Sequence, residues 1–161
     1  MTKKIKIMMN RFNSEKEKAE EMYKTINVVY CPYFKEKISF NSQGLQHLKF
    51  KRREKARSVD DQYMRFKLLY LAPVILKQSH TLQGIWETKK FERIRVHSRV
   101  DIVLKPVIYF EFIALINRNR VKIIVKQIDG GEKYFWSIIP FWGMDMATKT
   151  RLFYEGDPEE N

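Results

Sequence analysis

The strongest constraint on the fold is a change of residue pattern near residue 81. Before it, residues 13–26 and 58–79 predict helices, opened by Ser14 and Ser58 in N-cap positions. After it the pattern is that of strands, at 81–96, 99–105, 107–116, 120–128 and 132–142. Helices followed by strands predict an α+β domain, with N-terminal helices packed on a C-terminal, mostly antiparallel sheet of about four to six strands.

The helical half contains one short strand. Residues 35–41 predict a strand with Ile38 and Phe40 on one side, and Asn41 or Ser42 can cap a short helix after it that carries His47. We expect Pro73 to end or kink the helix at 58–79. The predicted organisation has an N-terminal helical extension at 1–35, peripheral to the fold, a core at 36–145, and a flexible polar and acidic tail at 146–161.

The charge of the chain indicates the class of partner. Lys and Arg number 31 against 19 Asp and Glu, which gives a net charge of +12, with a pI of 9.8. Such a surplus attracts polyanions, so we expect nucleic acid as the class of partner, although a chain can also be merely basic.

Other residue types narrow the setting of the protein. One cysteine, Cys31, excludes an intrachain disulfide and favours a reducing cytoplasm, and no apolar run approaches the length that spans a membrane. We expect no cofactor and no metal site, because no set of His, Cys, Asp or Glu shows ligand spacing.

The turn at residues 116–121 predicts the pairing of the two strands that flank it. INRNRV can close with a two- or a four-residue loop, and either choice pairs Leu115 with Lys122 and Glu111 with Lys126. Glu111 and Lys126 are then direct neighbours. The plainer interpretation of this pair is a cross-strand ion pair on a solvated face, worth about 0.2–1 kcal/mol.

The turn at residues 128–133 leaves two alternatives. A two-residue turn at 129–130 or 130–131 puts Lys126 on the face of Ser137, whereas a three-residue bulged turn would put Gln127 beside Ser137. With a two-residue turn, one face carries Glu111, Lys122, Lys126 and Ser137, and the opposite face carries Ile123, Val125, Trp136 and Ile138.

The residue types on the first face suit the cleavage of RNA without a metal. That reaction needs a base for the 2′-hydroxyl, an acid for the departing 5′-oxygen, and cations for the phosphate. We expect Glu111 as base, His47 as acid and Lys126 or Lys122 as the phosphate contact. Ser137 would donate a hydrogen bond. For His47 the plainer alternative is a helix-surface or core residue, and for Ser137 a small polar residue on a strand.

A basic run follows His47. KFKRREKAR, residues 49–57, holds six basic residues and one Glu, so contact with phosphate competes with a solvated charge run as its interpretation. The predicted nucleic-acid-binding residues are Lys49, Lys51, Arg52, Arg53, Arg65, Lys122 and Gln127.

Three segments, ISFNSQGLQHLKFKRR, MRFKLLYLAPVILKQS and VKIIVKQIDGGEKYFWSIIPFW, resemble the barnase–EndoU–colicin–RelE-like nuclease group over about residues 36–142. The resemblance implies helices in front of a four-stranded antiparallel sheet, with metal-independent ribonuclease activity and, in many members, a toxin role. It also implies functional roles for His47, Lys49, Lys126, Gln127 and Ser137. Because catalytic residues differ between branches of that group, the assignment of acid and base stays open.

Together these observations predict a metal-independent endoribonuclease of cytoplasmic location, in which the 2′-hydroxyl attacks the adjacent phosphate and leaves a 2′,3′-cyclic phosphate. If the protein is a toxin, we expect an acidic antitoxin or immunity protein to cover the basic face. The alternatives are a nucleic-acid-binding protein without activity on the same fold, and a protein–protein adaptor from a phage or mobile element.

Overall fold

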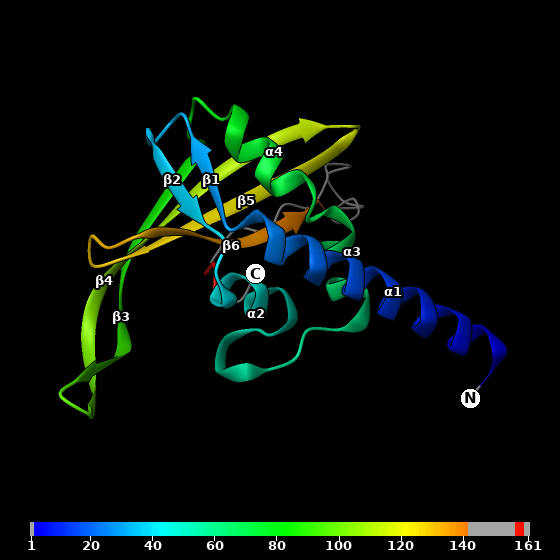
Figure 1. Cartoon of the computed structure of the whole chain (residues 1–161), viewed down its shortest axis with the longest axis horizontal. Coiled ribbons are helices and arrows are strands. Elements are labelled where there is room, and N and C mark those ends of the chain that lie inside the picture. The colour runs from blue at the N-terminus through cyan, green and yellow to red at the C-terminus, as the bar shows by residue number, and fades with distance from the viewer. Residues whose placement is uncertain (1, 142–156, 160–161) are drawn as a thin grey trace, which may run out of the picture.

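The computed structural model describes residues 2–141 and 157–159 and confirms an α+β domain with N-terminal helices and a C-terminal sheet (Figure 1). The sheet has six strands in the order β1-β2-β6-β5-β4-β3, antiparallel except between β2 and β6. The elements in chain order are α1 (Lys3–Ile26), β1 (Val28–Cys31), β2 (Glu36–Ser39), α2 (Ser42–Lys49), the 3-10 helix η1 (Arg52–Glu54), α3 (Val59–Leu68), α4 (Leu71–Gln78), β3 (Gly84–Val96), β4 (Arg99–Ile116), β5 (Asn119–Ile128) and β6 (Lys133–Pro140).

The first helix is longer than the sequence predicted. It begins after Thr2, whose side chain accepts a hydrogen bond from the backbone N–H of Ile5, so Ser14 lies inside the helix and does not cap it. The helix is also not peripheral, because it buries Phe12, Ala19 and Tyr23 in the main core. Residues 1–35 are therefore part of the same packed unit as the rest of the sheet, to which they contribute β1.

The predicted helix at 58–79 is broken where the chain passes from α3 to α4. Ser58 caps α3 as predicted, its Oγ accepting from the backbone N–H of Asp61 at 3.2 Å. The break falls at residues 69–70, and Pro73 lies in the first turn of α4. A proline is tolerated there because the first N–H groups of a helix have no intrahelical acceptor.

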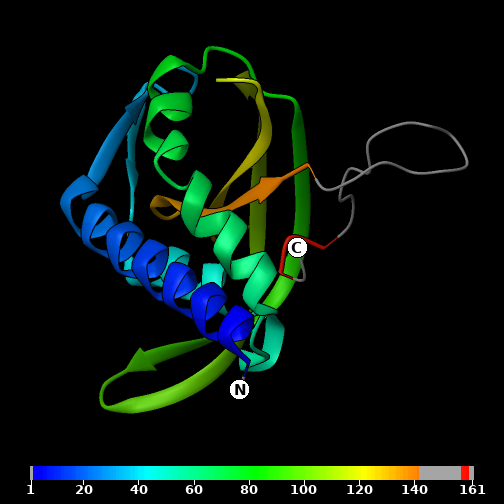
Figure 2. The same ribbon diagram turned by 90° about the vertical axis from the view of Figure 1, so that its right-hand side faces the viewer.

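The helices cover one face of the sheet (Figure 2). The main core lies between them and the strands, and it includes Ile38 and Phe40, the two residues predicted to point inward from the first short strand. A second, smaller apolar cluster lies on the opposite face. Its buried members are Val107, Tyr109, Ile124, Tyr134, Trp136 and Ile139.

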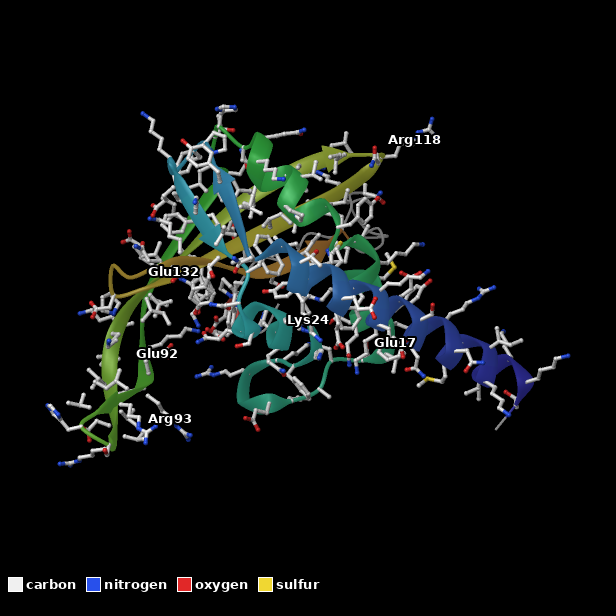
Figure 3. The ribbon with its side chains drawn as sticks, viewed as in Figure 1. Glu17, Lys24, Glu92, Arg93, Arg118 and Glu132 are labelled. Carbon is white, nitrogen blue, oxygen red and sulfur yellow. The ribbon has the colours of Figure 1, made fainter. Side chains whose placement is uncertain are left out.

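The two strands predicted at 99–105 and 107–116 form one strand, β4, which pairs with β3 along thirteen residue pairs. The far end of this β3–β4 hairpin projects beyond the helices (Figures 1 and 2). Figure 3 shows Arg93 near its tip, pointing outward.

The first hairpin register differs from the prediction by two residues. Ile116 pairs with Asn119, so the turn consists of residues 117 and 118, both with positive φ, as a tight two-residue hairpin turn requires. Glu111 consequently pairs with Ile124, and the partner of Lys126 is Tyr109. The shift is by an even number, so the faces of these two strands are as predicted.

The second hairpin combines a three-residue turn with a β-bulge. Lys126 pairs with Tyr134 and Val125 with Phe135, but Ile124 pairs with Ser137, so Trp136 is the extra residue. The predicted grouping is therefore wrong for Trp136, which shares the face of Lys126, whereas Ser137 lies opposite Ile124, two residues along the strand from Lys126. Gln127 pairs with Lys133 and not with Ser137, and its side chain donates to the Gly131 carbonyl at 2.9 Å.

Candidate functional site

A cleft of about 600 Å³ lies between α2, η1 and the Trp136 side of the sheet. We call it the histidine cleft. The lining residues that matter below are Gln43, His47, Lys51, Arg52, Glu54 and Trp136, together with Glu159. It therefore brings together His47, Lys51 and Arg52, three of the residues that the sequence predicted for the site.

The sequence of α2 explains why His47 reaches the cleft. Asn41 caps the helix as predicted, its side chain accepting from the backbone N–H groups of Gln43 and Gly44. Gly44 allows the helix to approach β6 closely, since a Cβ there would lie 2.3 Å from the Phe135 carbonyl oxygen. One turn further on, His47 lies against the same strand.

His47 is buried, with 5% of its surface exposed, and it is fixed by two neighbours. Its ring stacks on Trp136, with centroids 4.2 Å apart and planes inclined by 21°. Its Nε2 lies 3.0 Å from a terminal nitrogen of Arg57, and Arg57 Nε donates to the His47 carbonyl at 2.8 Å. Arginine has only donor groups, so Nε2 accepts, and a neutral ring carries its hydrogen on Nδ1.

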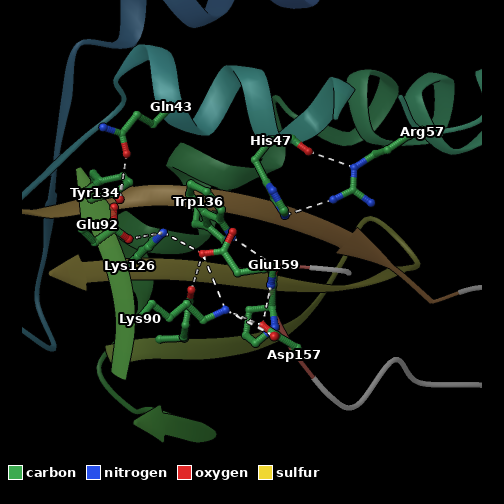
Figure 4. A network of polar contacts seen from close by, with 12 residues as sticks. Gln43, His47, Arg57, Lys90, Glu92, Lys126, Tyr134, Trp136, Asp157 and Glu159 are labelled. Atoms are coloured by element: carbon green, nitrogen blue, oxygen red, sulfur yellow. Dashed lines mark hydrogen bonds and ion pairs between the residues drawn. The ribbon is translucent and has the colours of Figure 1, made fainter. Parts of the chain in front are cut away.

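Beside the cleft, four neighbouring strands each contribute one donor to an anion site (Figure 4). We define it as Lys90 from β3, Tyr109 from β4, Lys126 from β5 and the indole N–H of Trp136 from β6. Lys126 is only 4% exposed, and its Nζ lies 4.0 Å from the Trp136 ring centroid. The same indole thus contacts both His47 and Lys126.

The anion site is occupied by the C-terminal segment Asp157–Pro158–Glu159 (Figure 4). Glu159 Oε1 accepts from Lys126 Nζ at 2.7 Å and from the Tyr109 hydroxyl, and the Pro158 carbonyl accepts from Trp136 Nε1 at 3.1 Å. Asp157 accepts from Lys90 Nζ at 3.0 and 3.3 Å. The prediction of a flexible tail is therefore wrong for these three residues, whereas 146–156 and 160–161 lie outside the described residues.

The contact between the C-terminal segment and the sheet shifts the pKa values of Asp157 and Tyr109. Burial acts to raise the pKa of Asp157, but the Glu159 backbone N–H and the Lys90 ammonium outweigh it and lower that pKa below its ordinary value. Burial, reinforced by the neighbouring Glu159 carboxylate, raises the pKa of Tyr109, so its hydroxyl keeps its proton and remains a donor.

The structure places two predicted catalytic residues away from the cleft lining. Glu111 accepts from Lys122 Nζ at 3.2 Å, further along the same sheet face. Ser137 is fully buried, and its Oγ accepts from Arg65 at 2.7 Å. Arg65 itself is buried and also bonds Asp61 and the Ile138 carbonyl, which makes it part of the packing between α3 and β6.

Another basic residue from the predicted set, Lys49, contacts the first helix. Lys49 forms an ion pair with Glu20 of α1 at 2.5 Å, so it is directed toward that helix. Arg53 is part of η1 and follows the cleft residue Arg52 in sequence.

Sequence reasoning missed Lys90, Tyr109, Arg57 and Glu159. Tyr109 and Lys126 share a face, which alternation along two paired strands reveals, so that signal was available. The signal for Glu159 was the acidic end of a chain with a charge of +12, where oppositely charged segments attract. Lys90 requires the register of the long hairpin, and Arg57 requires the fold of the loop between η1 and α3.

Within residues 2–141 and 157–159, no group of three or more His, Cys, Asp or Glu side chains is arranged to hold a metal ion. Among the same residues, no helix has the length and apolar character needed to cross a membrane. Comparison with known proteins finds no match to a family model, a curated protein or a solved structure. The function must therefore be argued from the site itself.

Proposed function

We propose that this protein binds RNA in the histidine cleft and at the anion site, and that it cleaves the bound strand without a metal. The observation that carries the proposal is the shared indole. His47 stacks on Trp136, and the buried ammonium of Lys126 lies against the same ring. A phosphate paired with Lys126 would therefore lie near a histidine, which is the combination that cleavage of a phosphodiester requires.

Single-stranded RNA fits this arrangement better than a duplex. A cleft of about 600 Å³ is too small for a double helix but can take unstacked nucleotides. Lys51 and Arg52 in its lining supply positive charge, and the partly exposed ring of Phe50, which also lines the cleft, offers a surface against which a base can stack.

In the proposed reaction, the 2′-oxygen attacks the adjacent phosphorus as a base takes its proton. The bond from phosphorus to the 5′-oxygen breaks, and an acid protonates that oxygen. The products are a 2′,3′-cyclic phosphate and a free 5′-hydroxyl. Lys126 stabilises the charge on the phosphate, and His47 is the proton-transfer group. Glu54, which lines the cleft, replaces Glu111 as the carboxylate partner, because Glu111 is paired with Lys122 outside the cleft lining.

A second candidate is RNA binding without cleavage, and the Arg57 contact favours it. Arg57 donates to His47 Nε2 at 3.0 Å, so that nitrogen can take up a proton only after this hydrogen bond opens. If the bond persists when RNA binds, Nε2 cannot take part in proton transfer, and the site binds RNA without cleaving it. In either case an acidic antitoxin or immunity protein would compete for the same cations.

The test compares wild type with His47→Ala and Lys126→Met, purified in parallel. Each is incubated with single-stranded RNA in EDTA, and products are analysed for 2′,3′-cyclic phosphate ends, while affinity is measured by fluorescence anisotropy at several salt concentrations. His80→Ala is the matched control, because His80 is exposed and lies after α4, outside the cleft lining.

A ribonuclease gives discrete products that disappear with His47→Ala but persist with His80→Ala, while RNA affinity falls mainly with Lys126→Met. A binding protein gives no products with any variant and a salt-dependent affinity that Lys126→Met weakens. Absence of both cleavage and salt-dependent binding in wild type would refute the proposal and leave a protein–protein adaptor as the interpretation.

A further inference from the structure

We propose that Asp157 and Glu159 occupy two adjacent phosphate subsites, so that the C-terminal segment of the chain competes with RNA for its own binding site. This inference rests on the proposed function, since it describes how the same site is regulated. It concerns occupancy and requires no cleavage.

The two subsites differ in their donors. In the first, Lys126 Nζ and the Tyr109 hydroxyl both donate to Glu159 Oε1, and Lys90 Nζ lies 3.9 Å from the same oxygen. In the second, Lys90 Nζ donates to both carboxylate oxygens of Asp157. Several donors converging on one anionic oxygen also suit a non-bridging phosphate oxygen, and lysine binds phosphate as readily as carboxylate.

The segment alternates charged and neutral groups, as a nucleic-acid backbone does. Asp157 Oδ1 accepts from the Glu159 backbone N–H at 3.0 Å, which folds the segment so that both carboxylates face the sheet. Between them, the Pro158 carbonyl accepts from the Trp136 indole. The segment therefore presents two negative groups flanking a neutral acceptor, as two phosphates flank the sugar of a nucleotide.

The exposed fractions of the side chains indicate that the carboxylates of Asp157 and Glu159 can leave while Lys90 and Lys126 stay in place. The side chains of Lys126 and Lys90 are 5% and 20% exposed, whereas those of Glu159 and Asp157 are 16% and 29% exposed. The carboxylates thus lie on the solvent side of each pair. Their departure would leave a buried ammonium on Lys126 with Glu92 at 3.9 Å as the nearest described carboxylate, so another anion would bind favourably there.

The experiment compares wild type, Asp157→Asn/Glu159→Gln and the control Glu17→Gln/Glu21→Gln, all as full-length chains. Both double variants remove two negative charges, but Glu17 and Glu21 are exposed on α1, as Figure 3 shows for Glu17. The probe is a short fluorescent 2′-O-methyl uridine oligonucleotide, which lacks the attacking hydroxyl. Circular dichroism verifies folding, and the Trp136 indole N–H resonance, assigned with Trp136→Phe, reports whether the segment is in place.

We expect Asp157→Asn/Glu159→Gln to bind the oligonucleotide about tenfold more tightly than the α1 control. In this variant the C-terminal segment does not have to leave the site before the oligonucleotide binds. Adding the oligonucleotide to wild type should move the Trp136 indole resonance, as loss of the Pro158 hydrogen bond requires. Equal affinity of the two double variants, with wild-type binding intact, would overturn the competition and leave RNA binding standing. No binding by any of the three would refute the proposed function itself, and this inference with it.

Discussion

Replacing Ser137 by alanine should destabilise the protein without impairing the proposed site. The sequence suggested Ser137 as a hydrogen-bond donor to a phosphate, but its Oγ is fully buried and accepts from Arg65. The two functions make opposite predictions for the same substitution. A substrate contact predicts normal stability and weak activity, whereas a structural role predicts the reverse.

The expected loss of unfolding free energy depends on which hydrogen bonds the Arg65 guanidinium keeps in Ser137→Ala. The lost bond, at 2.7 Å, joins a charged donor to a buried hydroxyl, and such bonds contribute about 1.5–3 kcal/mol. Arg65 still donates to the Ile138 carbonyl at 3.1 Å and to Asp61 at 2.6 Å, so no charge becomes unpaired. We therefore expect a loss near the lower end, about 1.5 kcal/mol in the free energy of unfolding.

Urea unfolding followed by far-UV circular dichroism measures this change, and an unaltered dependence on urea would show that the folded state keeps its compactness. RNA affinity and cleavage are measured on the same preparations and should stay within about twofold of wild type, since Ser137 contributes nothing to the cleft lining. Ser137→Thr, which keeps the hydroxyl, is the companion variant. A change in stability below about 0.5 kcal/mol together with a loss of cleavage would refute the structural assignment.

Three further predictions follow. Gly44→Ala should lower stability by about 1–3 kcal/mol in urea unfolding despite a better helix propensity, because its Cβ would collide with the Phe135 carbonyl; a gain in stability would contradict this. The pKa of Asp157 is lowered in the docked segment, so docking, read from the Trp136 indole resonance, should persist at pH 5 and weaken as pH falls below the ordinary value of 3.8; Asp157→Asn should reduce this pH dependence and leave the part that comes from the Glu159 carboxylate, and a loss already at pH 6 would contradict the prediction. Phe91→Ser should change unfolding free energy by less than about 0.5 kcal/mol, because Phe91 is 75% exposed on the projecting hairpin; a larger loss would show that something covers it.

Charged and titratable groups from several elements face the docked segment. Lys90 from β3 and Lys126 from β5 are the cations, Arg52 from η1 also lowers the pKa of Asp157, and Tyr109 from β4 stays protonated. An aspartate with a lowered pKa favours docking above its undocked pKa and loses that contribution as pH falls through the docked value. The contribution of Asp157 to docking is therefore fully present near neutral pH, where RNA would have to compete with the segment.

Local rules predicted the parts of the fold that depend on neighbouring residues. Asn41 and Ser58 cap their helices as expected, because capping involves only the next three residues. Ile38 and Phe40 point inward, since alternation is a property of the strand itself. Thr2 was missed as a cap because the residues after it, Lys3 to Lys6, are mostly polar and give no apolar spacing to recognise.

Features that depend on distant residues could not be predicted in the same way. The pairing of Arg57 with His47 joins residues ten positions apart through a loop, and the docking of Glu159 on Lys126 spans thirty-three positions. Composition indicated that positive charge would gather on this chain, yet which lysine becomes buried depends on the sheet register. The residues correctly grouped in the cleft, His47, Lys51 and Arg52, are close in sequence, so their grouping required little long-range information.

The β-bulge at Trp136 explains both the main error and the character of the site. In the registers predicted from a two-residue turn, which contain no bulge, Ser137 shares the face of Lys126 and Trp136 lies on the opposite face. The bulge lets Trp136 join Lys126 on one face while Ser137 bonds Arg65 in the helix layer. One inserted residue thus separates the buried hydrogen bond between Ser137 and Arg65 from the cleft. His47 and Lys126 both contact the indole of Trp136, which lines the cleft. A regular ladder without the bulge could not form both the Trp136–Lys126 contact and the Ser137–Arg65 hydrogen bond. We therefore place the proposed function at Trp136 and its neighbours and not at Ser137.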